Sequence, residues 1–202
     1  MGIYTTKSRW QEALRPAVKF CVSRRLHPDL FTYGALAISL LAATALYAAR
    51  FNRTWLWLVP PCVLLRLLLN LMDGQIARSM GLADAWGEVK NEFGDRAADA
   101  ALFIAIGLGG YADPRLALIV LATVLCSSYL GILGKALGGP RLYSGVFGKG
   151  DRMISLALFT LYPAYTGNLG SYNYYLAFAA AAALITILQR LKALHDRTQS
   201  VR

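Results

Sequence analysis

Cysteine and histidine are scarce in this sequence, and acidic residues are few. The 202 residues include three cysteines and two histidines, and 11 Asp and Glu stand against 21 Lys and Arg. The cysteines share no motif spacing, so they indicate neither a disulfide framework nor a zinc motif. His27 and His195 lie far apart beside charged or loop residues, and neither is interpreted as a metal ligand.

Long apolar blocks are the dominant feature of the chain. Its hydrophobic fraction of 56% exceeds the roughly 45–50% of soluble domains. Because a spanning helix needs about 20 apolar residues, the shorter third and fifth blocks must extend through polar ends. We therefore predict an all-α integral membrane bundle of about six transmembrane helices. The blocks are residues 30–49, 55–71, 97–110, 116–133, 153–164 and 174–188.

The first 26 residues differ from the rest. They are rich in Lys and Arg and lack the apolar run of a signal peptide. Apolar residues recur at helical spacing around Pro16, which predicts an amphipathic interfacial helix, broken or kinked near that proline. We predict that residues 1–26 form this helix and that residues 27–202 form a six-helix transmembrane catalytic domain.

The basic residues are distributed unequally between the predicted loops. Most fall at the N-terminus, around residues 78–96 and 135–152, and in the tail, whereas the other side receives only Arg50, Arg53 and Arg115. The positive-inside rule places both termini and the acidic stretch described next in the cytoplasm, with the protein in the inner or plasma membrane. Basic residues between apolar blocks suit lipid headgroups, and no nucleic-acid partner is expected.

The acidic residues concentrate between positions 70 and 99, where the second span ends and the third begins. Asn70, Asp73 and Ala77 share one helical face, and Asn91 and Asp95 share a face of the next helix. Two antiparallel helices can therefore point Asp73 and Asp95 into one space. Oxygen ligands without nearby His or Cys favour Mg²⁺ or Mn²⁺ over zinc.

This stretch resembles the signature of the CDP-alcohol phosphotransferase (CDP-alcohol phosphatidyltransferase) family, D-x2-D-G-x2-A-R-x8-G-x3-D-x3-D. Every spacing matches. The residues at the signature positions are Asn70, Asp73, Gly74, Ala77, Arg78, Gly87, Asn91 and Asp95. Gly74, Ala77, Arg78 and Gly87 resemble the family's CDP-contacting positions. In the family the four aspartates hold two metals and the last acts as general base, which implies metal ligation by Asn70, Asp73, Asn91 and Asp95 and a catalytic role for Asp95.

The chain departs from the signature at Asn70 and Asn91, where the family has aspartate. An Asn carbonyl oxygen can ligate a metal but brings no charge. Glu88 and Glu92 flank Asn91 and could compensate, although Glu92 lies about 100° around the helix from it. Whether one or two metals bind is left open by these substitutions.

The resemblance implies a membrane enzyme of phospholipid biosynthesis that uses Mg²⁺ or Mn²⁺. It would move a phosphatidyl group from CDP-diacylglycerol, or another CDP-alcohol, to a small alcohol or alcohol phosphate and release CMP. It also implies a homodimer. Residues 141–152 could receive an acceptor phosphate or lipid headgroup, with Lys135 and Arg96, or could form a plain positive-inside loop. Arg66 could pair with Asp73 or another site acid, or extend to the interface.

Two other functions would suit parts of this sequence. A non-catalytic lipid- or CDP-binding component would keep the pocket with a degenerate metal site. A transporter would carry charges near the midplane of several helices and often an inverted repeat. Because the acids cluster in one stretch of about 30 residues, transport is disfavoured.

Overall fold

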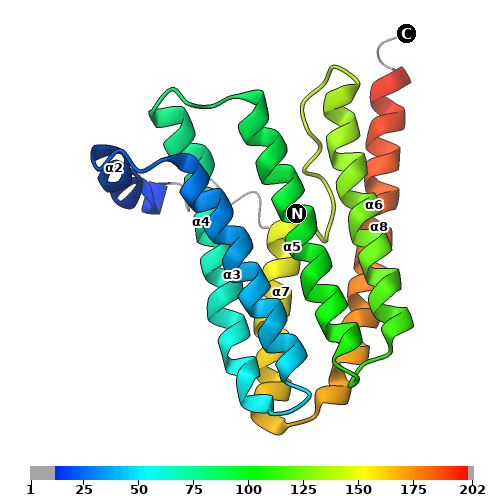
Figure 1. Ribbon diagram of the computed structural model, residues 1–202. Helices are drawn as coiled ribbons and strands as arrows, with labels where there is room; N and C mark the ends of the chain where they lie inside the picture. Colours follow the sequence, from blue (N-terminus) through cyan, green and yellow to red (C-terminus); the bar gives the residue numbers. More distant parts are fainter. Residues whose placement is uncertain (1–11, 200–202) are drawn as a thin grey trace.

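The computed structural model describes residues 12–199 as a bundle of long helices (Figure 1). Residues 1–11 of the predicted interfacial helix, and residues 200–202, lie outside the described residues. The elements are α2 (Arg15–Ser23), α3 (Pro28–Ala48), η2 (Arg53–Leu58), α4 (Val59–Ser79), α5 (Ala85–Leu108), α6 (Pro114–Ala136), α7 (Lys149–Thr166), η3 (Leu169–Ser171) and α8 (Tyr172–Gln199). The all-α prediction is confirmed.

Helix boundaries follow from local capping chemistry. Pro28 and Pro114 occupy the first turns of α3 and α6, where the missing N–H costs nothing. The Asp84 carboxylate begins α5 by accepting a hydrogen bond from the Gly87 N–H at 2.6 Å. Helix α7 ends at Thr166 and is capped by Gly167, whose φ of 77° requires a residue tolerant of the left-handed region.

Four helical segments within residues 12–199 are long and apolar enough to cross a membrane, which confirms an integral membrane protein. They are Pro28–Ala48, Arg53–Ser79, Pro114–Ala136 and Leu169–Gln199. Helix α5 packs between α3 and α6, and α7 packs against α4. Their beginnings carry charged residues, such as Glu88 in α5 and Asp151 in α7, and neither helix is among these four segments.

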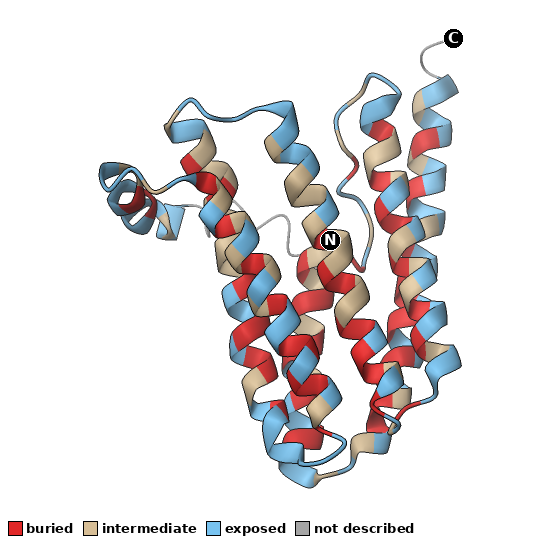
Figure 2. Ribbon diagram, in the orientation of Figure 1, coloured by how far each residue is buried: buried red, intermediate tan, exposed pale blue. Residues whose placement is uncertain are grey.

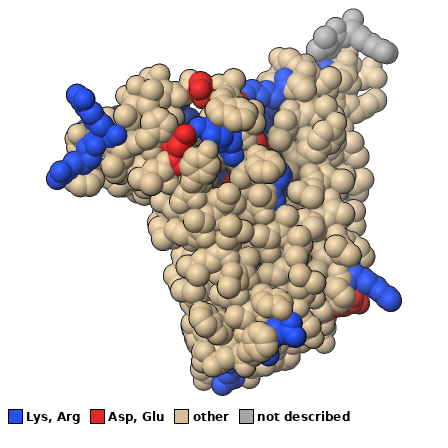
Figure 3. All heavy atoms as spheres, viewed as in Figure 1, with Lys and Arg blue, Asp and Glu red and all other residues tan. Residues whose placement is uncertain are grey.

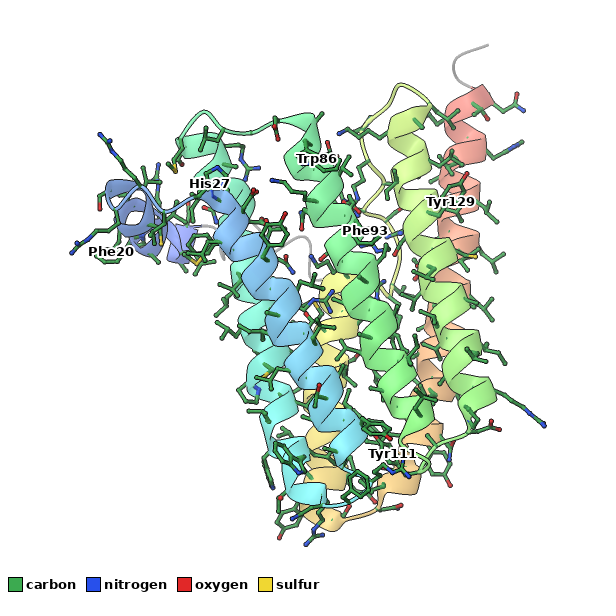
Figure 4. The ribbon with its side chains drawn as sticks, in the orientation of Figure 1. Phe20, His27, Trp86, Phe93, Tyr111 and Tyr129 are labelled. Carbon is green, nitrogen blue, oxygen red and sulfur yellow. The ribbon has the colours of Figure 1, made fainter. Side chains whose placement is uncertain are left out.

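Alanine-rich contacts hold the middle of the bundle together. Ala42 and Leu46 of α3 and Ala179 and Ala183 of α8 are fully buried, and Figure 2 shows buried residues running along the inward faces of the helices. Small side chains allow helices to approach closely where lipid gives no hydrophobic drive between them. At the far end, Tyr111 donates a hydrogen bond to the Leu46 carbonyl at 2.8 Å (Figure 4).

One end of the bundle collects the polar structure. The α2–α3 link, the α4–α5 loop, the α6–α7 segment and the end of α8 all lie there (Figure 1). Figure 3 shows most of the visible charged side chains at this end, above a broad uncharged band. Helices α3, α4 and α5 therefore meet the α6–α7 segment at a charged mouth, which we call the polar end.

Candidate functional site

A cavity of about 450 Å³ opens at the polar end between α3, α4 and α5. Its wall includes every signature position except Asp95: Asn70, Asp73, Gly74, Ala77, Arg78, Gly87 and Asn91. Helices α4 and α5 are joined by a short loop, so the two signature faces meet as their spacing predicts. His27 also lines the cavity. Figure 4 shows His27 at the start of α3 and Trp86 at the start of α5.

Asp95 lies deeper, in a small adjoining pocket that Asn70 and Asn91 also line. Its carboxylate accepts a hydrogen bond from the Lys149 Nζ at 2.6 Å and from the Asn70 Nδ2 at 3.5 Å. The Arg66 Nη2 lies 3.7 Å from the same carboxylate. Side chains from α4 and α7 thus hold the Asp95 carboxylate of α5, so all three helices must be in place to form this part of the site.

Asp99 forms the centre of a second buried cluster one turn further along α5. Its two oxygens accept hydrogen bonds from the Arg66 Nη2 at 2.9 Å and the Arg152 Nη2 at 2.8 Å. All three side chains are at most 4% exposed. Of the alternatives predicted for Arg66, pairing with a site acid other than Asp73 is confirmed.

The acids of α5 form a ladder of ion pairs with the α6–α7 region. Glu88, Glu92, Asp95 and Asp99 follow one helical face. Their partners from this region are Lys135, Arg141, Lys149 and Arg152, respectively. Glu92 also accepts a hydrogen bond from the Arg96 guanidinium at 3.2 Å. The 141–152 segment therefore supplies partners for carboxylates of α5, a role that sequence reasoning missed.

Two groups around Asp73 and Arg78 complete the cavity wall. The Thr32 hydroxyl donates to the Asp73 Oδ2 at 3.3 Å, which ties the start of α3 to α4. A Cβ added to Gly74 would lie 3.2 Å from the Arg78 Nη1, so the guanidinium lies directly over the glycine. Within residues 12–199, Arg78 has no acidic partner, unlike Lys90, which pairs with Asp29 at the same cavity.

The ligand chemistry of the cavity is dominated by neutral and charged oxygen groups. Within residues 12–199, no three His, Cys, Asp or Glu side chains gather as a metal-binding group. This follows from Asn70 and Asn91 standing where two carboxylates would otherwise be. The Asn91 Oδ1 is buried and accepts no hydrogen bond from any described residue, so it is a carbonyl oxygen free to meet a cation.

Comparison with known proteins gives concordant results. The sequence model of the CDP-alcohol phosphatidyltransferase family matches residues 25–188. The chain is 30% identical over 161 residues to inner membrane protein YnbA of Escherichia coli, covering 80% of each protein. It is 31% identical to the archaetidylinositol phosphate synthase of Aeropyrum pernix, covering 95% of each.

The fold also matches solved structures. The chain superposes on the phosphatidylinositol phosphate synthase of Mycobacterium tuberculosis with a TM-score of 0.71 and 24% identity, covering 88% of this chain and 90% of that one. That structure has CDP-diacylglycerol bound, and another of the same protein, also with a TM-score of 0.71, contains manganese and citrate.

The family match spans most of the chain and includes the whole cavity wall from His27 to Tyr143. Members of this family use divalent metals such as Mg²⁺ or Mn²⁺, so the predicted cofactor class is confirmed. The predicted enzyme class, a membrane transferase of phospholipid biosynthesis, is confirmed with it. The chain belongs to the CDP-alcohol phosphatidyltransferase family.

Proposed function

We propose that this protein transfers a phosphatidyl group from CDP-diacylglycerol to the hydroxyl of a small alcohol or alcohol phosphate and releases CMP. The observation that carries the proposal is the single cavity that gathers seven of the eight signature positions, with Asp95 in the small pocket that adjoins it. A structural relative with the same fold has CDP-diacylglycerol bound, which supports this donor.

The cavity wall suits a diphosphate. The Arg78 guanidinium has no acidic partner among residues 12–199 and can donate two parallel hydrogen bonds to a phosphate. Gly74, Ala77 and Gly87 leave room beside it, and any larger side chain at Gly74 would displace Arg78. These four residues are proposed to hold the CDP group.

Asn70, Asp73 and Asn91 are proposed to hold the divalent metal, together with Asp95. The buried, unpartnered Asn91 Oδ1 fits a cation ligand, and oxygen donors suit Mg²⁺ or Mn²⁺. When bound, such an ion neutralises charge that develops on the diphosphate.

Asp95 is proposed as the general base. It would accept the proton of the acceptor hydroxyl while the hydroxyl oxygen forms a bond to the β-phosphorus. The bond from that phosphorus to the CMP oxygen breaks, and the electron pair leaves with CMP. Lys149, Asn70 and Arg66 hold the carboxylate in place, so the proton acceptor is oriented before substrate arrives.

The membrane arrangement proposed from sequence has support in the fold. We propose six spans, formed by α3, α4, α5, α6, α7 and α8, within residues 27–202, and an interfacial helix over residues 1–26 that includes α2. Both termini and the site would face the cytoplasm, because charged side chains gather at the polar end (Figure 3). The homodimer also stays a proposal.

An alcohol phosphate is the first acceptor to test. The matching proteins from Aeropyrum pernix and Cutibacterium acnes are named as archaetidylinositol phosphate and phosphatidylinositol phosphate synthases. Arg141 lies at the cavity mouth with 23% of its side chain exposed, where an anionic acceptor would enter.

The test is CMP release by the purified full chain in liposomes. CDP-diacylglycerol and Mn²⁺ or Mg²⁺ would be supplied with inositol phosphate, glycerol phosphate, inositol, serine or choline. We expect release that depends on metal and on one acceptor. Asp95→Asn should lower the rate by about 10²–10⁴-fold, as the loss of a general base does. Asp113→Asn, at the opposite end of the bundle, is the matched control.

The alternative is a non-catalytic lipid- or CDP-binding component. It predicts CDP binding without release for every acceptor. If Asp95→Asn kept full CMP release, the transferase activity would stand, but Asp95 would not be the general base.

A further inference from the structure

Six charged side chains in and around the Asp95 pocket are buried or nearly buried, and the most exposed of them, Lys149, is 15% exposed. They are Asp73, Asp95, Asp99, Arg66, Lys149 and Arg152. The three carboxylates and the three basic groups give formal charges of −3 and +3. The Arg96 Nη2 also lies 3.7 Å from the Asp95 carboxylate, so the chain itself supplies at least as much positive as negative charge here before any divalent ion binds.

Lys149 is central to this balance. Its ammonium group contacts both oxygens of Asp95, at 2.5 Å and 2.6 Å. Asp95 stands at the last signature position, which by family resemblance is a metal ligand. A cation carried by the chain thus lies against a carboxylate where a metal would otherwise lie.

The other signature positions leave ligands for one ion. Asn70 and Asn91 replace two carboxylates and remove two negative charges. The Asn70 amide nitrogen donates to Asp95, so its carbonyl oxygen is the atom left for a metal. With the unpartnered Asn91 Oδ1 and the Asp73 carboxylate, this makes one set of oxygen donors beside the Lys149 ammonium.

We propose that this chain binds one divalent cation where the family signature holds two, and that the Lys149 ammonium, with a single positive charge, takes the place of the second. The proposal deepens the proposed function, on which it rests, by assigning Lys149 a place in the diphosphate site. Like charges repel strongly in a poorly solvated site, so a second divalent ion beside Lys149 and Arg66 is disfavoured.

Mn²⁺ is a suitable probe because both the number of bound ions and their proximity to one another can be measured. The purified full chain in detergent would be titrated with Mn²⁺, with and without CDP, and analysed by bound-metal content and electron paramagnetic resonance. Two Mn²⁺ ions in a shared site, about 3.5–4 Å apart, give a coupled spectrum. We expect one Mn²⁺ per chain with an uncoupled spectrum.

Variants test the role of Lys149 directly. In a chain carrying Asn70→Asp and Asn91→Asp, adding Lys149→Gln should create a second, coupled Mn²⁺ site. The matched control adds Lys135→Gln instead, since Lys135 is also paired with a carboxylate of α5 but is 52% exposed at the rim. The second Mn²⁺ should bind at least about 10-fold more tightly in the Lys149→Gln background, because a fixed like charge has been removed.

Wild-type protein with two coupled Mn²⁺ ions, or with none, would overturn the proposal. If the second Mn²⁺ bound with equal affinity in the Lys149→Gln and Lys135→Gln backgrounds, Lys149 would not be the group that takes the place of the second ion. If the Asp variants do not fold, the wild-type count still decides. One bound Mn²⁺ without CMP release from any acceptor would refute the proposed function alone, whereas CMP release with two coupled ions would refute this inference alone.

Discussion

Asp99 should be the most sensitive position for stability at the polar end. Its carboxylate is the only described acidic partner of Arg152, and it bridges Arg66 and Arg152 at 2.9 Å and 2.8 Å. Replacing it with asparagine removes one negative charge. Arg152 then has no acidic partner among the described residues, and Arg66 keeps only Asp95, at 3.7 Å. Neither group can reach water, since the Arg66 and Arg152 side chains are 1% and 4% exposed.

The magnitude follows from the cost of an uncompensated buried charge. Breaking a buried ion pair by removing one partner typically costs about 3–5 kcal/mol. For a chain of this size, each kcal/mol shifts the unfolding temperature by about 2–4 °C. Asp99→Asn should therefore lower the unfolding temperature by about 10 °C.

The assay is thermal unfolding in detergent, followed by intrinsic fluorescence. Asp29→Asn is the matched control, because Asp29 also forms an ion pair, with Lys90, but is 32% exposed. An exposed pair contributes about 0–1 kcal/mol, so this variant should shift the unfolding temperature little.

A rescue variant separates charge from packing. Arg66→Met, Asp99→Leu and Arg152→Met together remove the whole cluster, and buried ionic clusters can often be replaced by apolar residues without loss of stability. We expect this variant to recover most of the unfolding temperature. Equal unfolding temperatures for wild type and Asp99→Asn would refute the reasoning, and so would a triple variant less stable than Asp99→Asn.

Two further predictions concern the cavity wall. Gly74→Ala places a Cβ 3.2 Å from the Arg78 Nη1. We expect CDP to bind about 10-fold more weakly, because the displaced guanidinium loses one charge-assisted hydrogen bond to CDP. An unchanged Kd for CDP, measured by calorimetry, would contradict this. Thr32→Val removes the hydroxyl that donates to Asp73 at 3.3 Å. We expect Mn²⁺ affinity and the rate of CMP release to fall together by about 3- to 10-fold. A fall in the rate of CMP release at unchanged Mn²⁺ affinity would contradict a role for Thr32 in supporting the metal ligand Asp73.

Local periodicity predicted the helices and the two faces that form the cavity. The polar beginning of α5 could be expected because Asp84 is a strong capping residue. The extension of α8 from Leu188 to Gln199 could not be inferred from hydrophobicity. It depends on distant carbonyls: the Arg190 Nε donates to the Ser144 carbonyl at 2.9 Å, and the Arg197 Nη1 to that of Pro140 at 3.0 Å.

Most partners of the site acids could not be predicted from the sequence either, because they too come from distant parts of the chain. Lys149 and Asp95 are separated by 54 residues, and no local spacing relates them. Arg66 offered a signal, because it lies one turn before Asn70 on the same face and a buried arginine in a spanning helix needs an acid. Asn70 and Asn91 can be read as departures from the sequence alone, whereas the pairing of Lys149 with Asp95 and of Arg152 with Asp99 cannot.

The two asparagines and the buried bases are best understood as one electrostatic arrangement. Four carboxylates at the signature positions would carry a charge of −4, enough to balance two divalent ions. Here the signature positions carry −2, from Asp73 and Asp95, and Lys149 already neutralises half of that charge. Restoring Asn70 and Asn91 to aspartate without removing Lys149 would leave the ammonium competing with metal for Asp95. We infer that the substituted signature and Lys149 act together at the diphosphate site, and the effect of Lys149→Gln on the number of bound Mn²⁺ ions is the most direct measure of that role.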